Sequence, residues 1–390
     1  MSSLTGKKED PGSNICWDES QVESMYPDIF RVSGAPGEIA LLFGRREPSD
    51  REDGEEKVQG LRRVLLSPLT AKRLAVALDQ AVQSHNRNGS PAEKKNPSTA
   101  EEQLQSILQN PPFSKTDETA ARVEPIFQFL EKTKVEFGYE RSFKISEGTL
   151  SGKRFLLGIK ISTIGTRPHE QIMALCHQLG MPEELLKEFE VCLAGANVVG
   201  FGFDEHQSRC ACKTYLEFGE NFRKTIEKNR RRPEPFVFHK GFKWDASDQN
   251  RKAVATYTCT PFLSLKGLLE RVANVLDPDR DARAFEPARQ IVLAASRKIS
   301  GSDMLYMDVT EEGSPRQSFD LNLYRADLRM EEIHHILSDM CRSYAIPSEE
   351  LDVVYDPVRS EMFGHLAGGI DREGKDFLTI YHGVDGYFIP

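Results

Sequence analysis

Several features that define large classes of protein are missing from this sequence. No apolar run approaches the ~20 residues that a membrane-spanning helix needs, and the polar start MSSLTGKKEDPGSN has no apolar core. We therefore expect neither a membrane helix nor a signal peptide. The seven cysteines lack the spacing of a disulfide framework, which predicts reduced thiols in a cytoplasmic protein. The 51 Lys and Arg residues are outnumbered by 60 Asp and Glu, a balance that disfavours nucleic acid or an anionic membrane as partner.

The usual motifs for a metal or a phosphate loop are missing as well. No Asp-Asp-x-x-Asp motif is present, and Asp277–Asp281 (DPDRD) indicates a loop that ends a helix. Cys210 and Cys212 share one face of a strand without a second ligand pair, so zinc is not expected. Gly200 and Gly202 lie inside a strand, where glycine indicates a bulge or tight curvature rather than a phosphate loop. We expect no metal and no cofactor.

Composition divides the chain into a small and a large part. We expect residues 1–25 to be disordered and residues 26–84 to form a small β-β-β-α domain, with its helix starting at Ser67-Pro68. Residues 85–120 are polar and rich in Pro, Asn and Ser, which predicts a linker with one short helix at 100–109.

Residues 121–390 contain an internal repeat. Pairs of strand-like runs, each joined by a short polar turn, are separated mostly by helical stretches. Such pairs form antiparallel hairpins, and about ten strands can close into a barrel without free edges. We therefore predict an α+β fold, a ten-stranded antiparallel β-barrel of αββα repeats with its helices outside and a lumen wide enough for a ligand. An open α+β sheet or two sandwiched sheets would use the same elements.

A tyrosine recurs near the end of the second strand in four of the pairs. Because strand side chains alternate between faces and the intervening residues are mostly apolar or small, this position is predicted to face the lumen. Tyrosine rings can shield a carbocation, and hydroxyl and ammonium groups can bind an anion. Each tyrosine could also be an ordinary core residue, but the shared register favours a functional role. The five aligned positions hold Lys160, Tyr215, Tyr257, Tyr324 and Tyr381.

With this repeat and its motifs, residues 121–390 resemble the aromatic prenyltransferases of the αββα barrel type, closest to their indole (dimethylallyltryptophan synthase-like) branch. The resemblance implies metal-independent ionisation of a prenyl diphosphate behind a tyrosine shield, followed by capture by an aromatic acceptor. Glu140 and Ser142 in YERSF match the start of the family's first strand. The resemblance thus implies that Glu140 is catalytic, as the base or anchor for the acceptor.

The resemblance also implies a diphosphate-binding set. Arg154 in KRFLL and the motifs Lys-x-Tyr and Asn-x-Tyr match the family, and the expected set is Arg154, Lys160, Lys213, Tyr215, Tyr257, Asn322, Tyr324 and Tyr381. The third repeat departs from it, because Ala253 and Ala255 replace two cations that would hold diphosphate. Lys160, His239, Lys240 or Lys243 would compensate if they reached the lumen. Phe203 and Trp244 are candidates for stacking on the acceptor.

The implied function is transfer of an allylic, dimethylallyl-type group to an indole, a phenol or an aromatic side chain of a peptide. The missing cations leave open a barrel with another activity on a small aromatic ligand, as a lyase, cyclase or hydrolase. A non-catalytic binding protein is a further alternative. Residues 26–84 resemble a small uncharacterised bacterial domain family, which implies no chemistry but could dock a protein or peptide partner.

Overall fold

The structure is a computed structural model of the chain, and it divides into two compact units, Met1–Asn96 and Pro97–Pro390. Each unit is described by itself. The expectations for residues 1–25 and 75–99 lie outside the described residues. The structure describes residues 29–35, 38–46, 58–71, 74, 100–109, 111–113, 117–206, 209–229, 233–245, 247–280 and 283–385.

The first unit contains a three-stranded antiparallel sheet in the order β1 (Ile29–Ala35), β2 (Glu38–Arg46) and β3 (Val58–Leu66). A helix starts directly after β3, where the backbone N–H of Thr70 donates to Oγ of Ser67 at 3.1 Å. This contact is the expected N-terminal cap. The predicted β-β-β order and the start of the helix are thus confirmed for the described residues.

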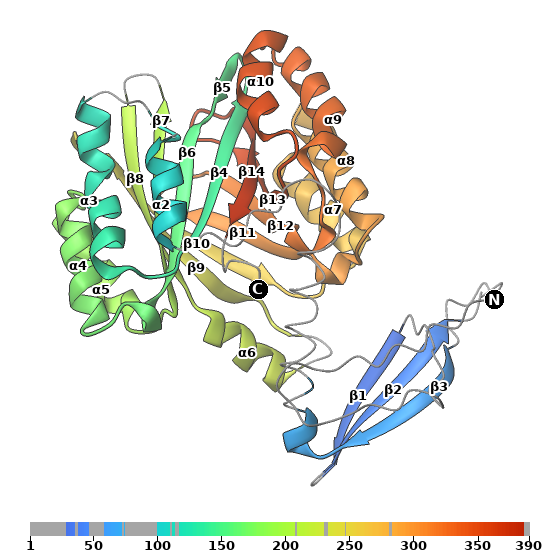
Figure 1. Cartoon of the computed structure of the whole chain (residues 1–390). Coiled ribbons are helices and arrows are strands. Elements are labelled where there is room, and N and C mark those ends of the chain that lie inside the picture. The colour runs from blue at the N-terminus through green and yellow to red at the C-terminus, as the bar shows by residue number, and fades with distance from the viewer. Residues whose placement is uncertain are drawn as a thin grey trace, which may run out of the picture. The chain divides into compact units, whose positions relative to one another are not determined.

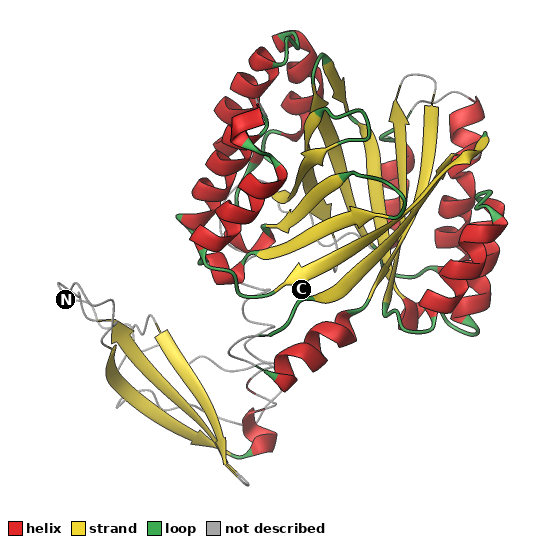
Figure 2. Cartoon of the chain, turned by 180° about the vertical axis from the view of Figure 1, so that it is seen from behind, coloured by secondary structure: helices red, strands yellow, loops and turns green. Residues whose placement is uncertain are grey.

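The second unit is a closed barrel (Figure 2). Its described residues contain an 11-stranded antiparallel sheet in which β14 also pairs with β4. Because β5 and β6 follow one another along the same side of β4, ten strand positions close the ring. This confirms the predicted ten-stranded barrel and excludes the open sheet and the sandwich. The strands are β4 (Gly138–Ser146), β5 (Thr149–Ser151), β6 (Lys153–Lys160), β7 (Val198–His206), β8 (Arg209–Glu217), β9 (Phe236–Asp245), β10 (Asp248–Thr260), β11 (Leu305–Glu311), β12 (Gln317–Asn322), β13 (Phe363–Ile370) and β14 (Asp376–Asp385).

Helices pack on the outer face of the barrel in two main groups (Figure 1). One group lies beside β6–β8 and the other beside β11–β14, and each group shares an apolar core with the strands that it covers. No described helix has the length and apolar character to cross a membrane, and no described cysteine forms a disulfide. The helices are α2 (Ala100–Gln109), α3 (Asp117–Thr133), α4 (Pro168–Gln178), α5 (Glu183–Leu193), α6 (Gly219–Lys228), α7 (Leu265–Val275), α8 (Phe285–Ser296), α9 (Met330–Ser343) and α10 (Ser348–Tyr355).

Part of the expected linker belongs to the barrel unit. The short helix expected at 100–109 is present as α2, but its Leu104 and Ile107 are buried in the apolar core. The ring of Phe113 packs against that of Phe155 on β6, with centroids 6.0 Å apart. A linker over the whole of residues 85–120 is therefore wrong, because three apolar side chains tie residues 104–113 to the barrel.

The two ends of the barrel differ in how the strands are connected. The strands of each pair are joined at one end, the hairpin end, and the helical connections leave from the other, the helix end. Gly148 and Gly374 lie in hairpin turns with φ of 64° and 79°, a conformation that glycine adopts without strain. Each strand pair therefore starts and finishes at the helix end, which brings residues distant in sequence into one lumen.

Candidate functional site

The predicted inward register of the tyrosines is observed. Tyr215, Tyr257 and Tyr381 line cavities in the lumen, whereas the intervening Thr214 and Ile380 are fully buried in the barrel wall. The rings of Tyr215 and Tyr257 meet edge to face, with centroids 6.0 Å apart. Strand alternation therefore places these phenol rings where a ligand would lie.

Tyr324 reaches the same region by a different route. Strand β12 ends at Asn322, whose Oδ1 accepts the backbone N–H of Tyr324 at 3.2 Å. This turn, which asparagine side chains favour, leads into a short helical turn that begins at Tyr324. The phenol still points inward, and its O–H donates to Oε2 of Glu140 at 2.5 Å. Asn322 therefore positions the tyrosine, and neither residue is among those lining the two lumen cavities.

Glycines on neighbouring strands make room for two of these rings. A Cβ atom on Gly241 of β9 would lie 2.9 Å from Cε1 of Tyr215. A Cβ atom on Gly364 of β13 would lie only 2.4 Å from Cε1 of Tyr324. Both distances are too short for carbon atoms in contact, so each ring depends on the absence of a side chain opposite it.

Lys160 does not complete the ring of inward residues. It has the expected register but is the last residue of β6, and its side chain is exposed and lines neither lumen cavity. The predicted register therefore gives the correct face of β6. The strand ends at Lys160, however, so this side chain does not reach the lumen. Its assignment to diphosphate binding is not supported.

Three cations surround one carboxylate in the lumen. Oδ2 of Asp204 lies 3.1 Å from Nη1 of Arg154, 2.6 Å from Nζ of Lys213 and 3.5 Å from Nζ of Lys243. Burial alone would raise the pKa of Asp204, but the cations hold it far below its usual range. Burial, together with the neighbouring cations, lowers the pKa of both lysines. The cluster thus has more cations than its single carboxylate can balance.

Lys243 supplies a cation on the strand beside the alanines of β10. It lies opposite Ala253 in the pairing of β9 with β10 and opposite Lys213 in the pairing of β8 with β9. Of the other candidates, His239 lines the lumen, whereas Lys240 lies outside the wall, paired with Glu188 of α5. Sequence spacing within β10 could not reveal a cation beside Ala253, because that cation comes from the neighbouring strand.

The hairpin end holds a cavity of about 580 Å³. Its lining includes eight Lys or Arg side chains and six Asp or Glu side chains. Lys144 of β4 lies over the ring of Phe377, with Nζ 4.2 Å from the centroid, and Arg316 lies over the same ring at 5.5 Å. Burial, with Arg154 and Arg316 nearby, lowers the pKa of Lys144 to about 8. Among the described residues Lys144 forms no ion pair, so its charge is available to an anion.

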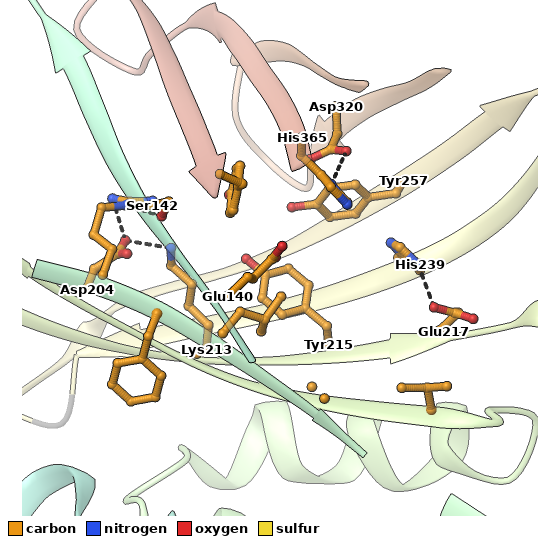
Figure 3. A pocket seen from close by; sticks show the side chains of 18 residues that line it. Glu140, Ser142, Asp204, Lys213, Tyr215, Glu217, His239, Tyr257, Asp320 and His365 are labelled. Atoms are coloured by element: carbon orange, nitrogen blue, oxygen red, sulfur yellow. Dashed lines mark hydrogen bonds and ion pairs between the residues drawn. The ribbon is translucent and has the colours of Figure 1, made fainter. Parts of the chain in front are cut away.

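Towards the helix end the lumen narrows to a second cavity of about 90 Å³, the inner cavity. Figure 3 shows Asp204 and Lys213 on one side of it, the pairs Asp320–His365 and Glu217–His239 on the other, and Glu140 between them. Glu140 is 8% exposed, and burial raises its pKa. Among the described residues, only its Oε2 accepts a hydrogen bond, so Oε1 is left for a ligand.

Phe203 and Trp244 turn their rings into the apolar core outside the barrel, although Trp244 is among the residues that border the larger cavity. The prediction that they stack on a ligand in the lumen is therefore wrong. Phe203 has the outward register of β7, and its ring packs against Phe155 and Phe113. The indole N–H of Trp244 donates to the backbone oxygen of Leu179 after α4 at 3.0 Å, outside the barrel wall. Both residues lie on the first strand of a pair, to which the tyrosine register of the second strands does not extend.

Several lumen residues were not predicted. They are Lys144, Asp204, Glu217, Arg316, Asp320 and His365. Most lie on the same inward face of their strand as a glycine, serine or alanine two residues away. Alignment of all ten strands would therefore place them in the lumen. No group of three or more His, Cys, Asp or Glu side chains within the described ranges is arranged to hold a metal ion.

Comparisons with known proteins found one family model and several solved structures that are similar to this chain. The model of a family described as "Protein of unknown function (DUF3467)" matches residues 2–94, and no curated protein matches the chain. AnaPT from Neosartorya fischeri is 13% identical, over 65% of this chain and 80% of its own, with a TM-score of 0.41.

Two further solved structures are similar to this chain. The 6-dimethylallyltryptophan synthase from Micromonospora olivasterospora, in complex with DMASPP and Trp, is 12% identical over 63% of this chain and 81% of its own, with a TM-score of 0.41. The NotF prenyltransferase is 10% identical over 75% of this chain and 98% of its own, with a TM-score of 0.44. At these identities the reaction has to be argued from the residues of the lumen.

Proposed function

We propose that the barrel transfers an allylic group of the dimethylallyl type from a diphosphate donor to an aromatic acceptor, without a metal ion. The observation that carries this proposal is the cluster in which Arg154, Lys213 and Lys243 surround one carboxylate beside tyrosine rings. Cations in excess favour an anionic ligand, and charge-assisted hydrogen bonds to phosphate oxygens are strong. Lys144 in the adjoining cavity adds a further cation.

In the proposed reaction, the C1–O bond of the donor breaks and diphosphate leaves with the bonding electron pair. Arg154, Lys213 and Lys243 stabilise the negative charge that develops on the leaving oxygen. The edge-to-face rings of Tyr215 and Tyr257 lie beside the cluster, and their faces stabilise the allylic cation and keep water away from it.

An aromatic carbon or heteroatom of the acceptor then bonds to C1, and the displaced proton passes to Glu140. Burial raises the pKa of Glu140, which makes its carboxylate a better proton acceptor than an exposed glutamate. Tyr324 holds Oε2 by a hydrogen bond, so Oε1 is the atom that would face the acceptor. An indole, a phenol or an aromatic side chain of a peptide fits this role.

Pyrophosphate release tests the proposal. The protein would be incubated with dimethylallyl diphosphate and a panel of indoles and phenols, with and without magnesium, and we expect prenylated product at similar rates in both conditions. Glu140→Gln should lower turnover by ~10²–10⁴-fold. Glu147→Gln, a matched change in the turn after β4 where Glu147 pairs with Arg283, should retain wild-type turnover. Absence of pyrophosphate release across the panel would contradict the proposal.

A second candidate is a barrel that binds or converts a less anionic aromatic ligand, as a lyase, cyclase or hydrolase. Two observations favour it: Asp204 already pairs with the lumen cations, and β10 presents Ala253 and Ala255 to the lumen. Titration with inorganic pyrophosphate separates the candidates. Saturable binding favours prenyl transfer, and its absence favours the second candidate.

For residues 26–84 we propose a docking role towards a protein or peptide partner. The division of the chain into two compact units, Met1–Asn96 and Pro97–Pro390, is consistent with such a role. A chain that begins at Pro97 should keep turnover on small acceptors and lose it on a peptide acceptor. Equal turnover of the two chains on both kinds of acceptor would contradict the proposal.

A further inference from the structure

The inner cavity has the opposite charge character to the hairpin end. Its lining includes four carboxylates but only two Lys or Arg side chains. Both of these cations pair with Asp204, so neither is paired with the three remaining carboxylates, which are Glu140, Glu217 and Asp320. Negative charge at the helix end and positive charge towards the hairpin end make the lumen electrically polarised.

Two imidazoles lie beside these carboxylates. Nδ1 of His365 is 3.1 Å from Oδ1 of Asp320, and Nε2 of His239 is 3.3 Å from Oε2 of Glu217. Burial alone would lower the pKa of His365, yet the carboxylates of Asp320 and Glu140 raise it to about 9. A buried imidazole that keeps its proton indicates a strongly negative potential around it.

Two carboxylates that line this cavity each have an oxygen without a donor among the described residues. Glu140 is 8% exposed and Asp320 is 7% exposed, and among the described residues only one oxygen of each accepts a hydrogen bond. Neither oxygen is among the fully buried atoms without a partner, so both remain open to the cavity. A ligand that supplies N–H groups could donate to them. The cavity volume of about 90 Å³ exceeds the ~10–15 Å³ needed for one water molecule, which leaves space for an ammonium group and its alkyl arm.

Aromatic rings complete the surroundings of this space. His239 lies 5.8 Å from Tyr257, and His365 lies 4.6 Å from Tyr324 and 5.7 Å from Tyr381, as centroid distances. Tyrosine faces attract organic cations, and an ammonium group brings three donors and a positive charge. Carboxylates and rings around one small cavity therefore favour an ammonium ligand over water or an anion.

We infer that the helix end of the lumen binds a protonated amine, and that the acceptor is an arylalkylamine, with an ammonium group and no carboxylate beside it. The aromatic part of this inference rests on the proposed prenyl transfer, whereas the ammonium site rests on the inner cavity alone. A zwitterionic amino acid would bring its carboxylate towards Glu217 and Asp320, where the lining cations are already paired with Asp204.

Equilibrium binding without any donor tests the ammonium site. Tryptamine, its uncharged analogue tryptophol and the amino acid tryptophan would be titrated into the full chain by calorimetry at neutral pH. A charge-assisted contact predicts that tryptamine binds about tenfold tighter than tryptophol. Tryptophan should bind more weakly than tryptamine, because its carboxylate meets like charge.

Two variants should shift this preference in opposite directions. Glu217→Gln removes one negative charge and should reduce the preference for tryptamine over tryptophol about tenfold. His365→Gln removes the cation beside Asp320 and should increase the same preference. Asp308→Asn, outside the barrel wall where Asp308 pairs with Arg271, should leave it unchanged. A general loss of structure would weaken binding in both lumen variants and cannot produce opposite shifts.

Equal binding of tryptamine and tryptophol would overturn the inference, as would no binding of any of the three compounds. Shifts of the same sign in Glu217→Gln and His365→Gln would also overturn it. Tryptamine preference without pyrophosphate release would leave the ammonium site standing and remove prenyl transfer. Pyrophosphate release with uncharged acceptors and no amine preference would remove the ammonium site and leave prenyl transfer standing.

Discussion

Asp204 would compete with the proposed diphosphate ligand for the same cations, and its replacement by asparagine tests that competition. The change keeps the shape of the side chain and removes the charge that Arg154, Lys213 and Lys243 share at 3.1, 2.6 and 3.5 Å. The side chains of Asp204, Arg154 and Lys213 are only 11%, 12% and 12% exposed. Solvent therefore screens these charges weakly.

Two effects of opposite sign follow from this geometry. Loss of one partner from a buried ion pair destabilises a protein by about 3–5 kcal/mol. We expect the lower end, about 3 kcal/mol, because the pKa of Lys213 is already well below its usual value and that lysine can release its proton. A charge-assisted hydrogen bond contributes about 1.5–3 kcal/mol, so removal of the competing carboxylate should tighten pyrophosphate binding about 10- to 100-fold.

Chemical denaturation and calorimetry with inorganic pyrophosphate measure both effects. Asp204→Asn should unfold more easily than the wild type and recover about 2.7 kcal/mol when pyrophosphate reaches 100 times its dissociation constant. Asp308→Asn is the matched control, because Asp308 is 38% exposed and pairs with Arg271 outside the wall. It should lose at most about 1 kcal/mol and bind pyrophosphate as the wild type does.

One result would refute the reasoning. If Asp204→Asn is destabilised as expected but binds pyrophosphate no more tightly than the wild type, the three cations form a structural ion-pair network. The diphosphate subsite would then have to lie elsewhere in the lumen, with Lys144 and Arg316 at the hairpin end as the next candidates.

Burial lowers the pKa of Lys144 to about 8, so we expect the pyrophosphate affinity of the wild type to fall above pH 8. Calorimetry of Lys144→Met should show no such fall. Gly241→Ala should lower turnover at least tenfold in steady-state kinetics, because its Cβ would lie 2.9 Å from Cε1 of Tyr215. His365 has a folded-state pKa of about 9 against a usual 6.5. Protonated His365 therefore contributes about 3 kcal/mol to the free energy of unfolding below pH 6.5, and this contribution is lost as pH rises through 9. Urea denaturation of His365→Gln should lack this dependence on pH.

The local part of the site was predictable because strand alternation has a period of two. Tyr215, Tyr257 and Tyr381 were placed inward from their register alone, and the structure bears this out. The same alternation places Phe203 of β7 and Trp244 of β9 on the outer face, opposite to the predicted one. Lys160 shows a second limit. Strand alternation gives the face on which its side chain lies, but only the observed end of β6 shows that it lies at the rim of the barrel.

The contacts that define the chemistry depend on closure of the barrel. Glu140 and Tyr324 are 184 residues apart, and Lys243 reaches Asp204 from a strand that does not neighbour β7 in the sheet. Such contacts are set by the order and stagger of the strands around the barrel. No local sequence pattern encodes that order. The sequence by itself determined the repeat, the strand pairs and the inward tyrosines, because period and turn chemistry are local properties. Only the tertiary structure decided that cations gather on Asp204 and carboxylates at the helix end, because charge in a lumen is the sum over strands brought together by folding.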